Sequence, residues 1–77
     1  MLTPQGPASY RCVNLPTLEN VLVQNGYQSI PTKSTYEAMR YQRMRSIIIL
    51  YHNGTVLLQG ADLDTPRQLF AKIIPTT

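Results

Sequence analysis

The side chains that most often carry catalysis or bind metals are few in this sequence and widely separated. They comprise one histidine, one cysteine and four acidic residues: His52, Cys12, Glu19, Glu37, Asp62 and Asp64. General acid–base catalysis and metal binding require such groups at spacings that bring them together, and these residues show no such spacing. We therefore predict a protein that is not an enzyme, with no cofactor, no metal site and no small-molecule substrate.

A second kind of chemistry is indicated between residues 33 and 45, where basic and aromatic side chains alternate around a single acid, Glu37. Cations neutralise phosphates and tyrosines stack on bases or sugars, and the whole chain has a formal net charge of +3. The predicted nucleic-acid-binding residues are Lys33, Arg40, Tyr41, Arg43 and Arg45, with Gln59 as a contact to a sugar or groove edge. If this segment is a strand, Arg40 faces away from Tyr41 and Arg43. The alternative is a solvated basic connection with tyrosines in the core.

The elements that position these residues are arranged around residues 46–60, SIIILYHNGTVLLQG. Two aliphatic runs flank Asn53-Gly54, a pattern typical of a β-hairpin with a two-residue type I′ turn. In the resulting register Leu50 faces Leu57. One face of this hairpin carries Ile47, Ile49, Tyr51, Val56 and Leu58, and the other carries Ile48, Leu50, His52, Thr55, Leu57 and Gln59. Since both faces are largely apolar, we expect helices on one and a partner or ligand on the other.

Two helices have well-marked ends. Asn14 as N-cap and Gly26 as C′ residue predict a helix over 15–25, with an apolar stripe suited to packing on a sheet. The sequence Thr65-Pro66-Arg67-Gln68 is a capping box and predicts a helix over 66–74.

Further strands are predicted over 36–43 and, as shorter candidates, over 10–13 and 27–30. Residues 1–9 contain two prolines and a glycine, so we expect a flexible lead-in to a single domain over 10–77. The predicted fold class is α+β, with a three- to four-stranded antiparallel sheet and two helices packed on one face.

The segment from Tyr36 to Ile74 resembles the N-terminal substrate-binding domain of ribonuclease HIII, which has the TATA-box-binding-protein-like fold. The matching residues are Tyr51, Gly54, Val56, Leu57, Gln59 and Gly60. It is also similar to a small domain of RNA-cleaving toxins of the RnlA and LsoA type. The resemblance implies a curved sheet with helices on its convex side, a concave face that grips an RNA/DNA hybrid, and no catalysis in the domain. The aliphatic run Ile47 to Leu50 departs from that pattern.

Two functions remain open. The first is binding of a nucleic-acid duplex, in particular an RNA/DNA hybrid. The alternative is protein interaction, as a homodimer or as a small phage-like or toxin–antitoxin regulator, through an apolar patch of Ile48, Leu50 and Leu57 on the uncovered face. No signal-peptide pattern and no long apolar run is present, which predicts a cytoplasmic protein with no membrane partner.

Overall fold

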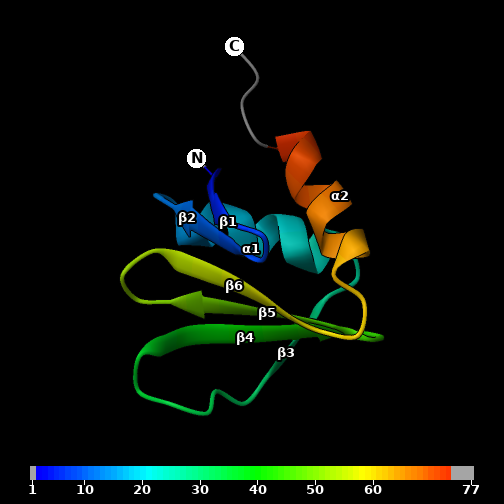
Figure 1. Cartoon of the computed structure of the whole chain (residues 1–77). Coiled ribbons are helices and arrows are strands. Elements are labelled where there is room, and N and C mark those ends of the chain that lie inside the picture. Colours follow the sequence, from blue (N-terminus) through cyan, green and yellow to red (C-terminus); the bar gives the residue numbers. More distant parts are fainter. Residues whose placement is uncertain (1, 74–77) are drawn as a thin grey trace.

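A six-stranded antiparallel sheet and two helices make up the computed structural model, which describes residues 2–73 (Figure 1). The elements are β1 (Leu2–Gly6), β2 (Ser9–Cys12), α1 (Leu15–Gln24), β3 (Gln28–Ile30), β4 (Glu37–Arg43), β5 (Ser46–Tyr51), β6 (Thr55–Gly60) and α2 (Asp64–Ile73). The strands lie in the order β1-β2-β6-β5-β4-β3. The predicted α+β class is confirmed, whereas the predicted number of strands is too low.

Strand β1 occupies the segment for which the sequence predicted a flexible lead-in. Leu2 pairs with Cys12 and Thr3 with Arg11, and Leu2 is only 1% exposed. Pro4 is compatible with this strand because β1 lies at the edge of the sheet, where a missing N–H group breaks no interior ladder. Residues 2–6 are therefore part of the sheet, and Leu2 is part of the core.

The β5–β6 hairpin forms as predicted, but its register differs by one residue. Leu50 pairs with Val56 and Ile49 with Leu57, whereas the predicted two-residue turn placed Leu50 opposite Leu57. The pairing of Leu50 with Val56 leaves three residues, 52–54, in the loop, and Gly54 N–H donates to the Tyr51 carbonyl at 2.9 Å. The predicted type I′ turn is therefore wrong.

Backbone angles explain the longer loop. A type I′ turn needs positive φ at both central residues, but in this loop only Gly54 has one, at +92°. A three-residue hairpin loop needs a left-handed residue only at its last position, and glycine takes that conformation without steric cost.

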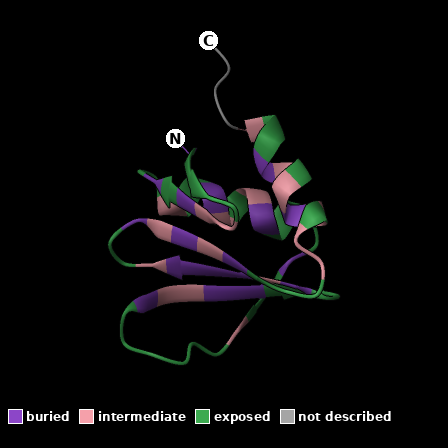
Figure 2. Ribbon diagram, viewed as in Figure 1, coloured by how far each residue is buried: buried purple, intermediate pink, exposed green. Residues whose placement is uncertain are grey.

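The one-residue difference redistributes the hairpin side chains between the two faces of the sheet. One face carries Ile48, Leu50, Val56 and Leu58, which share a core cluster with Leu18 and Leu22 of α1 and Phe70 of α2. Both helices lie on one side of β4, β5 and β6 in Figure 1, and the buried stretch of β5 is evident in Figure 2. The other side, which we call the open face, carries Ile47, Ile49, Tyr51, Thr55, Leu57 and Gln59.

Helix α1 begins at the predicted residue, ends one residue before the predicted Asn25, and has the predicted flanking residues. The Asn14 side-chain oxygen accepts a hydrogen bond from Thr17 N–H at 3.2 Å, and Gly26 follows the helix with a φ of +87°. The N-cap bond satisfies one of the unpaired donors of the first turn, and the left-handed glycine ends the helix.

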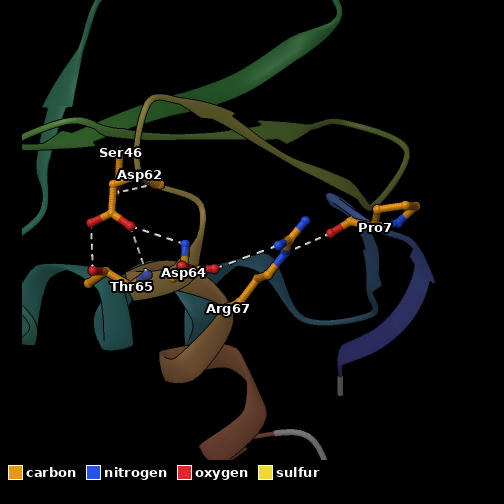
Figure 3. A network of polar contacts seen from close by, with 6 residues as sticks. All are labelled: Pro7, Ser46, Asp62, Asp64, Thr65 and Arg67. Carbon is orange, nitrogen blue, oxygen red and sulfur yellow. Dashed lines mark hydrogen bonds and ion pairs between the residues drawn. The ribbon is translucent and has the colours of Figure 1, made fainter.

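Helix α2 begins at Asp64, two residues before the predicted start, and Asp62 caps it (Figure 3). Asp62 Oδ1 accepts from the N–H groups of Asp64 and Thr65, and Oδ2 accepts from the Thr65 hydroxyl at 2.6 Å. The Thr65 hydroxyl bond, followed by the backbone bonds, lowers the pKa of Asp62. Because Thr65 donates to Asp62, the predicted capping box with Gln68 is wrong; the predicted end at residue 74 lies outside the described residues.

Candidate nucleic-acid interface

Cross-strand pairing arranges the side chains of the open face in three rows, since directly paired residues point to the same side of a sheet. The first row is Gln28, Gln42, Ile47 and Gln59, from β3, β4, β5 and β6. The second is Ile30, Arg40, Ile49, Leu57 and Ser9, and the third contains Glu37, Tyr51, Thr55, Arg11 and Thr3. The face thus combines a row of amides, a largely apolar middle row, and a mixed polar row.

Arg40 lies in the middle row and forms a two-point ion pair with Glu37. Its Nε donates to Oε1 at 2.9 Å and its Nη2 donates to Oε2 at 3.2 Å, and the two side chains are 8% and 4% exposed. The Glu37 carboxylate also accepts from Lys33 N–H at 3.3 Å. The hydrogen bond from Arg40 is the main reason that the pKa of Glu37 is lowered.

This ion pair depends on an irregularity in β4. Residues three apart on a regular strand face opposite sides, but the pairing of β4 with β5 shifts between Glu37 and Met39. The shift brings Glu37 to the side of Arg40. The guanidinium of Arg40 therefore already holds an anionic partner and is nearly buried, so it is poorly placed for the phosphate contact predicted from the sequence.

Tyr41, also predicted to bind nucleic acid, lies on the covered face and is 4% exposed. Its hydroxyl donates to Glu19 Oε1 of α1 at 2.9 Å. Burial, followed by this hydrogen bond, raises the pKa of Tyr41 to about 12. The position of Tyr41 therefore agrees with the alternative drawn from the sequence, in which the tyrosines of this segment lie in the core.

Arg43 is exposed at the end of β4 and lies against the C-terminal end of α1. A Cβ placed on Gly26 would come within 3.2 Å of Arg43 Nε, so the guanidinium is close to the helix end. A cation at this end complements the helix dipole. Arg43 is thus separated from Arg40 by the sheet, as the alternation of the strand predicted.

The other predicted cations lie around the face. Lys33 is exposed in the loop 31–36, and Arg45 is exposed in the β4–β5 turn beside Met44, which has a φ of +52°. Gln59 is exposed in the amide row. The structure therefore disperses the predicted basic patch into separate positions.

Arg11 is an exposed cation of the open face that the sequence analysis missed. Its neighbours Tyr10 and Cys12 are buried, so the alternation of β2 directs Arg11 to the opposite side. That alternation is visible in the sequence, but it becomes informative only when residues 9–12 are assigned to the sheet.

The largest difference between prediction and structure concerns the predicted protein interface of Ile48, Leu50 and Leu57. Ile48 and Leu50 are 0% exposed in the core, so the prediction that they line the uncovered face is wrong, because the helices cover the side of β5 that carries them. The one-residue register difference separates Leu57 from these two residues. Leu57 does lie on the open face, half-buried beside Ile49.

Surface hollows lie toward both ends of the strands. One of about 410 Å³ is lined by Gly26, Gln28, Ile30, Gln42, Arg43 and Met44. Another, of about 170 Å³, is lined by Thr35, Tyr36, Tyr51, His52 and Asn53. Within residues 2–73 no cluster of histidine, cysteine and acidic residues is arranged to hold a metal ion, and no helix there is long and apolar enough to cross a membrane.

The same fold occurs in a solved structure. The crystal structure of RNase H3 from Aquifex aeolicus matches with a TM-score of 0.63 over 82% of this chain, at 18% sequence identity. The match covers 25% of the RNase H3 chain, so the present chain corresponds to about a quarter of that protein. No protein-family model matches the chain, and no curated protein matches its sequence. The resemblance to ribonuclease HIII seen in the sequence is therefore confirmed as a likeness of fold.

Proposed function

We propose that this chain is a non-catalytic nucleic-acid-binding domain that holds a duplex, preferably an RNA/DNA hybrid, against its open face. The observation that carries the proposal is the amide row, in which exposed Gln28, Gln42 and Gln59 lie on β3, β4 and β6, with Ile47 of β5 between the last two. An amide both donates and accepts hydrogen bonds, which suits base edges in a groove and the ribose 2′-hydroxyl. The adjacent apolar row suits contact with sugars.

Charge and fold support the same function. Arg11 on the face, and Lys33 and Arg45 in the bordering loop and turn, are exposed cations suited to phosphates. The fold shared with RNase H3 supports a nucleic acid as ligand. The choice of an RNA/DNA hybrid follows from what the ribonuclease HIII resemblance in the sequence implies.

The acidic residues support a non-catalytic role, because each has a structural partner. Glu19 accepts from Tyr41, Glu37 pairs with Arg40, and Asp62 caps α2. Asp64 lies 3.8 Å from the Arg67 guanidinium. These carboxylates are dispersed over the fold. Glu19, Glu37 and Asp62 make internal hydrogen bonds, whereas Asp64 is largely exposed.

The test is a titration of labelled RNA/DNA hybrid, DNA duplex and single strand at several salt concentrations. Phosphate contacts make affinity fall steeply with salt, so Arg11→Ala should weaken binding and reduce the log–log salt slope by about 1. Gln42→Ala should reduce the preference for hybrid over DNA. Lys72→Ala is the matched control, because Lys72 is exposed on α2. Absence of binding to all three at low salt, or an Arg11→Ala variant that binds as the parent does, contradicts the proposal.

A second candidate, protein interaction, is favoured by one observation. Ile30, Ile47 and Leu57 lie partly exposed near one another on the open face, on both sides of the buried Ile49. A homodimer or a protein partner would cover this apolar band. Sedimentation of the parent and of Leu57→Asp tests it: a dimer dissociated by the substitution supports this candidate, and a monomer at high concentration excludes the homodimer.

A further inference from the structure

We infer that the hollow beside the β5–β6 loop binds the base of one unpaired nucleotide. This hollow, here called the tyrosine hollow, is lined by Thr35, Tyr36, Tyr51, His52 and Asn53. Two loops build it, the loop 31–36 before β4 and the loop between β5 and β6. Tyr51 also belongs to the third row of the open face, so the hollow lies at the margin of the proposed duplex-binding face.

The hollow is held open by backbone contacts and has room for one flat ring. His52 N–H donates to the Tyr36 carbonyl at 3.1 Å, which joins the two loops. Gly54 N–H donates to the Tyr51 carbonyl at 2.9 Å, which fixes the second loop. The volume is about 170 Å³, and a cavity of roughly 150 Å³ in a protein core takes up one benzene molecule.

The side chains in the tyrosine hollow match the chemistry of a base. Tyr36 is 77% exposed, whereas Tyr10, Tyr27, Tyr41 and Phe70 are all buried in the core. An exposed aromatic ring is a stacking surface for any base, because every base has a π-face. Asn53 Oδ1 already accepts from Thr55 N–H at 3.0 Å, so its amide nitrogen is the group it has to offer the edge of a base, beside the Thr35 hydroxyl.

A cation for the neighbouring phosphate lies across the loop. His52 and Asn53 also line an adjoining hollow of about 460 Å³, to which Arg11 contributes. A nucleotide whose base occupies the tyrosine hollow therefore has an exposed guanidinium within the next depression of the surface. This combination of aromatic ring and cation favours a nucleic-acid strand over an apolar protein segment.

This inference rests on the proposed function for its ligand class, and its first test needs no duplex. The ring protons of Tyr36, Tyr51 and His52 are followed by NMR while adenosine monophosphate is added. We expect these three rings to shift while the buried rings of Tyr10 and Phe70 stay in place. Tyr36→Phe should retain the shifts of the other two rings, and Tyr36→Ala should weaken them.

The second test compares three RNA/DNA hybrids: one blunt, one with a single-nucleotide overhang, and one with the same overhang lacking its base. Stacking of the size seen for bases on aromatic residues corresponds to at least a fivefold gain in affinity from the base. Tyr36→Ala should abolish that gain and leave the blunt hybrid unaffected, whereas Met44→Ala, an exposed side chain in the β4–β5 turn, should preserve it.

The outcomes separate the inference from the proposed function. If the blunt hybrid binds and the overhanging base adds nothing beyond the abasic one, the inference is overturned and the proposed function stands. If no duplex binds but the mononucleotide shifts Tyr36 and His52, the inference stands and the duplex function fails. If the mononucleotide moves none of the three rings, the tyrosine hollow is not a base site.

Discussion

The substitution Gly54→Ala, which adds one methyl group, tests the observed geometry of the hairpin loop. Its φ of +92° lies in the region that L-residues with a side chain avoid. A Cβ at this position would also lie 2.8 Å from the carbonyl oxygen of Cys12, a backbone atom of β2. The same segment is joined by a hydrogen bond of 2.7 Å from Cys12 N–H to the Gly54 carbonyl. Gly54→Ala therefore strains the loop and separates it from β2.

The expected destabilisation follows from these two effects. A non-glycine residue held at positive φ costs about 1–2 kcal/mol. Relieving the overlap with Cys12 moves the loop away from β2 and weakens a hydrogen bond that contributes about 1 kcal/mol. The sum is roughly 2–3 kcal/mol. For a domain of this size each kcal/mol shifts Tm by about 4–8 °C, so Gly54→Ala should melt at least ~8 °C below the parent.

Urea unfolding monitored by circular dichroism measures this difference, with an unchanged m-value as evidence that the same structure unfolds. Gly6→Ala is the matched control. A Cβ on Gly6 meets only Ser9 Cβ, at 3.9 Å, and Gly6 has no positive φ. That variant should stay within about 1 kcal/mol of the parent. A Gly54→Ala protein as stable as Gly6→Ala would refute the described loop geometry.

Three further outcomes are expected. Because the folded-state pKa of Asp62 is lowered, the stability contributed by its carboxylate is present above the ordinary pKa of 3.8 and is lost as the pH falls through the lowered pKa. In a pH series of urea unfolding midpoints, Asp62→Asn should therefore weaken the loss of stability at acidic pH. The same loss of stability in the parent and in the variant would contradict the cap. Because the pKa of Tyr41 is raised to about 12, its buried neutral hydroxyl stabilises the fold fully below pH 10, and this stabilisation is lost as the pH rises toward 12. An absorbance titration should show one tyrosine that ionises near pH 12, and Tyr41→Phe should remove that step. Leu50→Asp should prevent folding because it places a carboxylate in the core, whereas Leu57→Asp should fold and should bind hybrid less well; circular dichroism and the hybrid titration check both, and equal tolerance of the two substitutions would contradict the face assignment.

Local patterns in the sequence were sufficient for the elements whose signals are local. Helix α1 carries its N-cap Asn14 and its C′ residue Gly26 within the sequence of the helix region, and the structure uses both. Strands β5 and β6 have strong aliphatic runs and lie within the hairpin that the sequence predicts over residues 46–60. The resemblance to ribonuclease HIII, which rests on the hairpin motif, agrees as a likeness of fold with the structural match to RNase H3.

The features that the sequence did not predict depend on residues that pair with partners distant in the sequence. Strand β1 contains proline and ends in glycine, which suggests a loop, and it becomes a strand because β2 is available for pairing and Leu2 enters the core. The Glu37–Arg40 pair depends on a pairing irregularity against β5 that no spacing in β4 indicates. Arg11 can be recognised as a cation of the open face only after β2 is placed beside β6.

The hairpin loop decides which side chains make up the functional surface. Asn-Gly suits a two-residue turn with both residues at positive φ, but a three-residue loop that ends in glycine can be built from the same dipeptide. In the shorter loop Gln59 would have faced Ile48; in the observed loop it pairs with Ile47 and joins the row of Gln42 and Gln28. The amide row on which the proposed function rests therefore exists because of one additional loop residue.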